Sequence, residues 1–329
     1  MQLILSHSHV SPEMLLRMCR ASPKLRTLYG PKNVYMPDTT IAAISATCPE
    51  LISVSLSQVG KNYSPAETWA HHFPRLGGLK LSRDGSLYLP TQLDAIRNAA
   101  LTCRHATGLE IDGCYITAAV IDAIVGTPVG DRLSALDDID DEATNIEPAA
   151  FLAAARGFPE LDFLVIPSGS RMGGPHFYID LSRTTARITS LEIHDFGTTD
   201  ACIAAACSHL HLEWLELHEL DLLTSSIVDG ITRSQSTATL SHLKIAYCAQ
   251  LPERSPLRAA DMLRLVRGCP ELDTLDWRCN NAFIDYAQLD RGTCQAIIDL
   301  LKSRDTTVYC DYFGQLDAGV SVPNCIFAC

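Results

Sequence analysis

The sequence predicts an α/β solenoid, in which short strands and helices alternate and stack into a parallel sheet on the concave side with helices on the convex side. Three observations predict it. A short apolar phrase recurs about every 27 residues, a helical segment precedes most copies, and a proline often separates the two. Because one strand–helix unit cannot bury its own apolar side, neighbouring units must share a continuous core.

The phrase is an apolar residue followed by two variable positions, a second apolar residue, one variable position and a third apolar residue. Its copies include Leu25-Leu28, Leu51-Val54-Leu56, Leu76-Leu79-Leu81, Leu109-Ile111, Leu133-Leu136, Leu161-Leu164-Ile166, Ile188-Leu191-Ile193, Leu212-Leu215-Leu217, Leu240-Leu243-Ile245 and Leu272-Leu275-Trp277. The second apolar position advances by 24 to 32 residues. Leucine-rich repeats are about 20–29 residues long. The spacing therefore predicts a leucine-rich-repeat solenoid, or horseshoe, of about 10–11 repeats.

Helical segments are expected before these strands, at residues 11–20, 39–47, 64–73, 91–103, 147–156 and 257–268. The run Ser64-Pro65-Ala66-Glu67 carries an N-cap serine, a proline at the first helical position and a capping-box glutamate. Prolines 23, 49, 74, 159 and 270 each stand two residues before the apolar residue that opens a strand. Proline cannot continue a helix, so these residues predict where the helices end.

Composition narrows the classes of partner. The 329 residues carry a formal charge of −12, and no run of lysine and arginine is visible, so neither nucleic acid nor a membrane is an expected partner. No apolar run reaches the roughly 18 residues of a membrane span, and the opening residues are not expected to be a secretory signal. The 13 cysteines are scattered and odd in number, which indicates reduced thiols in a cytoplasmic or nuclear protein.

Several phrases contain cysteine at recurring places. They are Cys48-Pro49-Glu50-Leu51-Ile52-Ser53-Val54-Ser55-Leu56, Cys269-Pro270-Glu271-Leu272-Asp273-Thr274-Leu275-Asp276-Trp277, and Leu109-Glu110-Ile111-Asp112-Gly113-Cys114. Cys248 takes the place of Cys114 in a later repeat. In a further repeat Asn280, which follows Cys279, takes that place. This pattern resembles the cysteine-containing leucine-rich repeats of F-box-type proteins, within the ribonuclease-inhibitor-like superfamily. The resemblance covers nearly the whole chain. It implies substrate recognition, as in a ubiquitin ligase adaptor.

One domain is expected over residues 1–329, with repeats over 1–310 and a C-terminal cap over 311–329. Residues 1–10 already contain a strand at Leu3-Ile4-Leu5, so the F-box itself is not expected in this chain. Three connections, 137–147, 166–175 and 280–293, exceed the length of the repeat. Such loops either carry function or are tolerated insertions, and both interpretations stay open.

Side chains alternate across a strand, so the residues between the apolar positions face the concave side. The partner-binding candidates on this face are Glu110, Asp112, Asp137, Phe163, Val165, Glu192, His194, Trp214, Glu216, His218, His242, Lys244 and Asp276. Aromatic anchors among acidic residues are typical of a protein-binding hot spot. They predict a partner segment with basic and apolar residues, although a merely solvated acidic face is the alternative.

His194, His218 and His242 fall on neighbouring strands, with His209 and His211 just before one of them. A zinc site there is conceivable, but no CxxC or HExxH spacing supports it, so no metal ligand, catalytic residue or cofactor is assigned. The chain has no P-loop and no nucleophile elbow. Cys202 and Cys207 lie near His209 but on apolar helix positions, which indicates core. Inward Lys80, Lys244 and Arg278 are too dispersed to form a phosphate pocket.

The most favoured function is therefore a protein–protein interaction module and not an enzyme, with substrate recognition as its most specific form. A structural or scaffold subunit of a larger assembly is the first alternative. A metal-dependent hydrolase that uses the histidine cluster is the second.

Overall fold

A computed structural model of the chain describes residues 1–5, 10–30, 36–55, 72–73, 75–82, 90–103, 105–112, 115–138, 145–168, 172–184, 187–195, 197–220, 222–246, 259–278, 296, 299–300, 307–310 and 325–326. The chain divides into two compact units. Unit 1 holds Met1–Thr144 and Ala153–Leu161, and unit 2 holds Asn145–Leu152 and Asp162–Cys329, so the division falls within helix α6 (Pro148–Gly157). A single domain over residues 1–329 stays a prediction.

Unit 1 alternates short strands with helices. The strands are β1 (Gln2–Ile4), β2 (Thr27–Tyr29), β3 (Ser53–Ser55), β4 (Gly78–Ser82), β5 (Gly108–Asp112), β6 (Tyr115–Ile116) and β7 (Ala135–Asp138). The helical elements are α1 (Pro12–Ala21), α2 (Asp38–Thr47), α4 (Pro90–Thr102), α5 (Ala118–Ile124) and the 3-10 turn η1 (Gly130–Arg132). Strands β1, β2 and β3 pair in parallel in that order, as do β4, β5 and β7.

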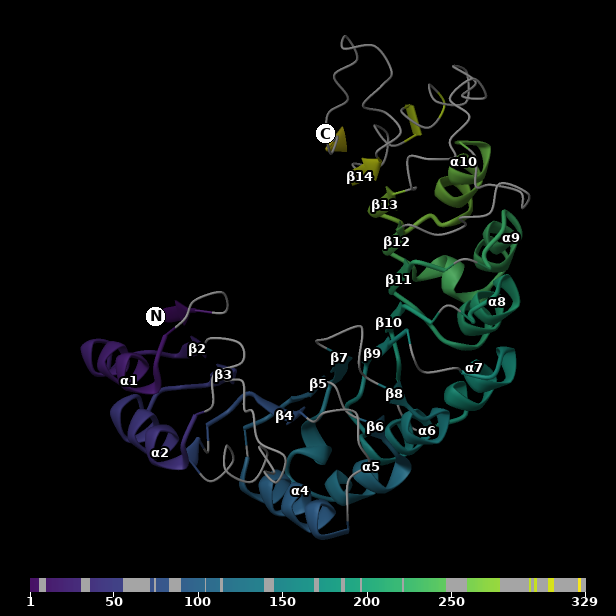
Figure 1. Cartoon of the computed structure of the whole chain (residues 1–329). Helices are drawn as coiled ribbons and strands as arrows, with labels where there is room; N and C mark the ends of the chain where they lie inside the picture. The colour runs from purple at the N-terminus through teal and green to yellow at the C-terminus, as the bar shows by residue number, and fades with distance from the viewer. Residues whose placement is uncertain are drawn as a thin grey trace. The chain divides into compact units, whose positions relative to one another are not determined.

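Unit 2 repeats the same alternation. Its strands are β8 (Asn145–Ile146), β9 (Phe163–Ile166), β10 (Ser190–Ile193), β11 (Trp214–His218), β12 (His242–Ala246), β13 (Thr274–Arg278), β14 (Thr307–Cys310) and β15 (Cys325–Ile326). Its helical elements are α7 (Pro175–Ser182), α8 (Asp200–His209), α9 (Ser226–Thr232), η2 (Gln235–Ala238) and α10 (Ala259–Gly268). Strands β9 to β15 pair in parallel in chain order. In each unit the strands lie along one side and the helices along the other (Figure 1).

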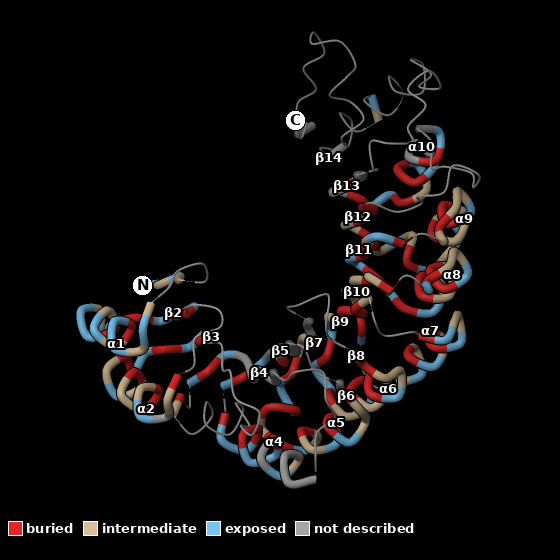
Figure 2. Tube along the Cα trace, viewed as in Figure 1, coloured by how far each residue is buried: buried red, intermediate tan, exposed pale blue. Residues whose placement is uncertain are grey.

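The second apolar residue of each phrase aligns across neighbouring strands. In unit 2 the aligned residues are Leu164, Leu191, Leu215, Leu243, Leu275 and Val308. In unit 1, Leu28 aligns with Val54, and Leu79 aligns with Leu109 and Leu136. These leucines are buried wherever their side chains are described, and buried residues lie between the strands and the helices (Figure 2). The predicted repeat register is therefore confirmed, and the core is the space between sheet and helices.

Local signals explain where the helices begin and end. Ser11 is the N-cap of α1, and its hydroxyl accepts a hydrogen bond from the Met14 amide. Helices α1, α2, α4, α6 and α10 confirm five of the predicted segments within one or two residues of the predicted ends. Glycine allows close helix packing: a Cβ on Gly230 of α9 would lie 2.9 Å from the Cβ of Ala204 in α8.

Several predicted features lie outside the described residues. They are residues 64–71 of one predicted helix, the loop 280–293, Cys114, Cys248, Cys279 and Asn280, and most of the predicted cap, from which only β15 is described. Strand β14 (Thr307–Cys310) lies at the end of the predicted repeat region, residues 1–310. The connection predicted at 166–175 is also present, since β9 ends at Ile166 and α7 begins at Pro175.

A buried hydroxyl links two successive repeats of unit 2. The Ser236 hydroxyl lies 2.9 Å from the Cys207 carbonyl and 2.6 Å from the Leu210 carbonyl, and it accepts the Leu212 amide at 3.0 Å. In unit 1 the Cys48 thiol contacts the carbonyls of Cys19 and Ser22 over the same sequence separations of 29 and 26 residues. Ser236 therefore occupies the cysteine position of its repeat, where it joins one helix end to the next strand.

We expect Ser236→Ala to lower the free energy of unfolding by about 1–3 kcal/mol, because the buried Leu212 amide and two carbonyls lose their partner. Urea denaturation followed by circular dichroism measures the change. Ser241→Ala is the matched control, because its hydroxyl donates to the Glu213 carbonyl at 3.1 Å in an exposed setting. The control should change stability by less than about 0.5 kcal/mol. Equal losses in the two variants would contradict the role assigned to Ser236.

Candidate functional site

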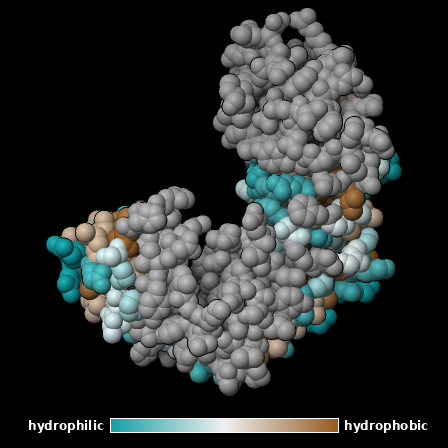
Figure 3. All heavy atoms as spheres, in the orientation of Figure 1, coloured by the Kyte–Doolittle hydropathy of each residue, from teal (hydrophilic) through white to brown (hydrophobic). Residues whose placement is uncertain are grey.

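The in-register strands of unit 2 place alternate side chains in rows on the sheet face that points away from the helices, which we call the open face. The first row is Phe163, Ser190, Trp214, His242 and Thr274. The second row is Val165, Glu192, Glu216, Lys244 and Asp276. Hydrophilic residues gather over β11 and β12 in the surface view (Figure 3). The sequence-predicted candidates of unit 2 are thus neighbours in space.

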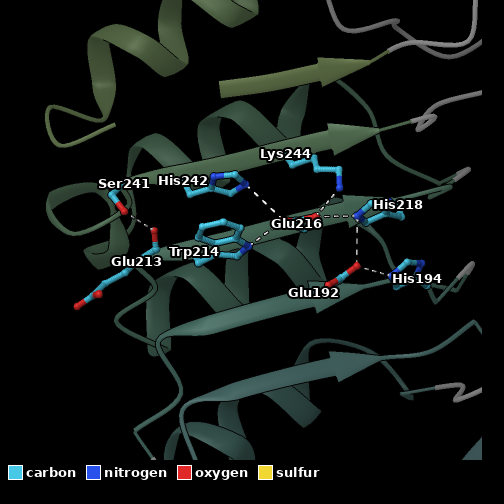
Figure 4. A network of polar contacts seen from close by, with 9 residues as sticks. All are labelled: Glu192, His194, Glu213, Trp214, Glu216, His218, Ser241, His242 and Lys244. Atoms are coloured by element: carbon cyan, nitrogen blue, oxygen red, sulfur yellow. Dashed lines mark hydrogen bonds and ion pairs between the residues drawn. The ribbon is translucent and has the colours of Figure 1, made fainter. Parts of the chain in front are cut away.

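Seven of these candidates form one set of polar contacts, which we call the β10–β12 network (Figure 4). Its members are Glu192, His194, Trp214, Glu216, His218, His242 and Lys244. Figure 4 also draws Glu213 and Ser241, which are joined to each other through the Glu213 carbonyl and not to the network.

Glu216 is the centre of the network, and its side chain is only 11% exposed. Its Oε1 accepts the indole N–H of Trp214 at 2.9 Å. Its Oε2 lies 2.7 Å from Lys244 Nζ and 3.0 Å from His218 Nε2. His242 Nε2 lies 3.4 Å from Oε1, close enough for electrostatic attraction. The carboxylate is therefore satisfied within the chain.

The pKa of Glu216 depends on its burial and on its hydrogen-bonding and charged partners. Burial alone would raise the pKa of the carboxyl, since it disfavours the charged form. Contacts with His218, His242 and Lys244 outweigh burial and hold the pKa well below its usual range. Glu216 is therefore an anion near neutral pH, and Lys244 is the cation that neutralises it.

Trp214 and His242 form the aromatic part of the network. Their rings stack with centroids 3.4 Å apart and an angle of 6° between the planes. The stack covers His242, whose side chain is 13% exposed, while Trp214 itself remains 39% exposed. The Trp214 ring is thus fixed in position and still exposes apolar surface, as a residue that anchors an interface must.

Glu192 and two histidines form the other part. Glu192 Oε1 lies 2.8 Å from His194 Nε2 and 3.4 Å from His218 Nε2. The two imidazoles stack with centroids 4.5 Å apart and planes 10° apart. His218 therefore bridges Glu192 and Glu216.

The other predicted residues lie apart from the network. Glu110, Asp112 and Asp137 are on β5 and β7 of unit 1, where Glu110 aligns with Asp137, and the structure describes only their backbone. In unit 2, Phe163 is half-buried, whereas Val165 and Asp276 are buried and offer little surface to a partner. His209 and His211 are exposed and are not part of the histidine cluster.

The cysteines near His209 have the character of core residues. Cys202 and Cys207 are buried in α8, as the apolar pattern predicts. Burial raises the pKa of the Cys207 thiol to about 12, with a further contribution from Cys269. A reactive cysteine requires the opposite shift of its pKa.

In the described part of the chain, no helix is both long and apolar enough to cross a bilayer.

Sequence reasoning named every member of the network, but it did not predict the stacking of Trp214 on His242 or the contact of Lys244 with Glu216. The register makes these residues neighbours, whereas the contacts depend on side-chain rotamers. Sequence reasoning also missed Ser236, the buried serine that links two repeats. Its position could have indicated this role, because Ser236 stands four residues before Leu240, much as Cys48 stands three residues before Leu51.

Comparison with known proteins identifies the architecture. No family model and no curated protein matches the chain. A chain of the crystal structure of the yeast Rad7–Elc1 complex matches over 97% of this chain and 88% of its own, at 15% identity and a TM-score of 0.50. A Bacteroides fragilis protein covers 71% of this chain and 65% of its own, at 14% identity and a TM-score of 0.41. TLR13 in complex with ssRNA13 covers 83% of this chain and 42% of its own, at 16% identity and a TM-score of 0.35.

The first of these likenesses agrees with the repeat phrase and with the in-register parallel strands. The chain is a leucine-rich-repeat solenoid, as the sequence predicts.

We expect Glu216→Gln to lower the free energy of unfolding by about 1–3 kcal/mol, because the glutamine keeps the shape of the side chain but leaves Lys244 without its anionic partner. Chemical denaturation measures the loss. Glu213→Gln, at an exposed glutamate, is the matched control and should change stability by less than about 0.5 kcal/mol. If both variants behave like the unmodified chain, the network does not stabilise the fold.

Proposed function

We propose that the protein is an interaction module that binds a protein segment on the open face of unit 2, with Trp214 as the anchor. The observation that carries the proposal is the exposed Trp214 ring, which is fixed by the indole hydrogen bond to Glu216 and by stacking on His242. A ring that is already ordered loses little conformational freedom on binding.

Charge indicates the chemistry of the partner. With neutral imidazoles, Glu192 and Glu216 contribute two negative charges to the network and Lys244 one positive charge, which leaves −1. Glu216 is engaged by Lys244, so Glu192 is the carboxylate that a partner's lysine or arginine can reach. A basic segment with an apolar side chain fits this surface, and the chain's net charge of −12 favours its approach.

The more specific form of the proposal is substrate recognition in an F-box-type assembly. Two observations support it. The cysteine-containing phrases place Cys48 and Cys269 as buried free thiols, as their repeat position requires. A structural neighbour of the chain comes from the Rad7–Elc1 complex, so this architecture occurs in a multiprotein assembly.

Selection of random peptides on the purified chain tests the binding proposal. Enriched peptides should combine lysine or arginine with an aromatic or aliphatic residue. Trp214→Ala should weaken the affinity of a selected peptide by at least about 30-fold, the usual effect of losing a hot-spot aromatic residue. Fluorescence anisotropy at two salt concentrations measures the affinity and its charge dependence.

Leu101→Ala is the matched control, because Leu101 is an exposed apolar residue, at 44%, on helix α4. It should leave the peptide affinity unchanged. Peptides without any basic preference, or a Trp214→Ala variant that binds them as tightly as the unmodified chain, would contradict the proposal.

Capture of the tagged full chain from cells, followed by mass spectrometry, tests the specific form. An adaptor should co-purify with ubiquitin-ligase scaffold subunits in amounts that Trp214→Ala does not change, whereas its substrates should be depleted by that substitution. A structural subunit, the alternative, should instead yield one stable complex of constant composition. That second result, with no ligase subunit present, would overturn the adaptor role but leave protein binding intact.

A further inference from the structure

The three ligand-type atoms of Glu192, His194 and His218 converge on one point of the open face. The carboxylate oxygen and the two imidazole nitrogens all lie within 4.8 Å of one another. The side chains come from the end of β11 and from β10 and the residue that follows it. No part of the proposed protein binding requires this convergence.

We propose that Glu192, His194 and His218 form a binding site for a single divalent transition-metal ion of the zinc class. This inference goes beyond the proposed function, because it concerns a different ligand and would hold without any protein partner. Two imidazoles and one carboxylate leave at least one coordination position open to water.

The distances from the Glu192 carboxylate to the two imidazole nitrogens suit zinc. A tetrahedral ion with metal–ligand bonds of about 2.0–2.1 Å separates its ligand atoms by about 3.3–3.4 Å. Here Glu192 Oε1 lies 2.8 Å from His194 Nε2 and 3.4 Å from His218 Nε2. Shifts of well under 1 Å would therefore bring the first pair to the required separation, and the second pair already has it.

The rings of the two histidines are stacked beside Glu192. Adjacent strands lie about 4.8 Å apart, so residues that follow one another across the sheet stack their rings. The rings of His194 and His218 lie 4.5 Å apart and nearly parallel, and both turn a nitrogen toward Glu192 (Figure 4). Because an imidazole binds an ion in the plane of its ring, the two stacked rings must rotate to bind one ion through both nitrogens.

Access and charge also favour an ion. The side chains of His194, His218 and Glu192 are 15%, 16% and 24% exposed, so the site is supported by protein but open to solvent. The carboxylates of Glu192 and Glu216 and the ammonium of Lys244 sum to −1, so a divalent cation meets net negative charge. Glu216 Oε2 lies 3.0 Å from His218 Nε2, the same nitrogen that faces Glu192, so an ion bound to this nitrogen must replace the contact with Glu216.

The donor set selects the class of metal. Imidazole nitrogen suits zinc, copper, nickel and iron, whereas magnesium and calcium prefer sites made wholly of oxygen. His242 does not belong to the set, because its ring stacks on Trp214 and its Nε2 lies 3.4 Å from Glu216 Oε1.

Metal titration of the full chain tests the site. Chelator-treated protein is titrated with zinc chloride in the presence of a chromophoric competitor, without any partner protein. We expect one tight ion per chain. His194→Ala, His218→Ala and Glu192→Gln should each weaken binding at least about 100-fold, since each removes a direct ligand. His211→Ala, at an exposed histidine of the same unit, is the matched control and should bind like the unmodified chain.

Two further measurements separate this site from others. Cobalt(II) in place of zinc should show d–d absorption without a sulfur charge-transfer band, because no cysteine belongs to the ligand set. In the unmodified chain, zinc should protect His194 and His218, but not His211, from diethylpyrocarbonate, as mapped by mass spectrometry. This readout needs no variant to fold.

Three results would overturn the proposal. The first is the absence of stoichiometric binding at micromolar zinc. The second is a thiolate charge-transfer band in the cobalt(II) spectrum. The third is equal modification of His194 by diethylpyrocarbonate with and without zinc. Peptide binding measured in chelator is independent of these results. A failed metal site and a failed interaction module can therefore be told apart.

Discussion

Every feature of the open face depends on the in-register parallel pairing of the repeated apolar residue. Leu191, Leu215 and Leu243 align across β10, β11 and β12 and point into the core. Because side chains alternate along a strand, their neighbours must align on the opposite face. A slip of one residue would bury Glu216 among leucines and expose Leu215, at a cost that no surface contact offsets. The core therefore sets the geometry of the polar rows.

The same constraint explains why the network is largely satisfied within the chain. A carboxylate as buried as Glu216 would be costly without partners, and the register supplies Lys244 directly across from it on β12. Trp214, two residues earlier on the same face, adds its indole N–H. A partner's cation would have to compete with Lys244 for this carboxylate. The surface that remains available is thus the Trp214 ring and the Glu192 side of the network.

The sequence was sufficient for the repeat and its register, because Leu164, Leu191, Leu215, Leu243 and Leu275 recur every 24 to 32 residues and burial enforces a period of two in each strand. It was also sufficient to name the network residues. It could not predict that Val165 would be buried or that His242 would lie against Trp214. Side-chain rotamers and local packing decide those outcomes, and neither leaves a periodic signal. Ser236 was missed because a hydroxyl replaced the thiol of its repeat position.

The two proposed activities use opposite ends of β11 but share Glu192, which offers its carboxylate either to an ion or to a partner's cation. Trp214 begins this strand and His218 ends it, and at about 3.3 Å per residue the four steps between them span about 13 Å. Glu216 stands midway and contacts both ends, through the indole of Trp214 and the imidazole of His218. An ion on His218 would draw this imidazole toward Glu192 and away from Glu216, which would strengthen the hold of Lys244 on Glu216. The Trp214 anchor keeps its own hydrogen bond to Glu216 Oε1 in either case, so an ion would leave this anchor in place while it occupies the Glu192 carboxylate that a partner's cation would otherwise reach.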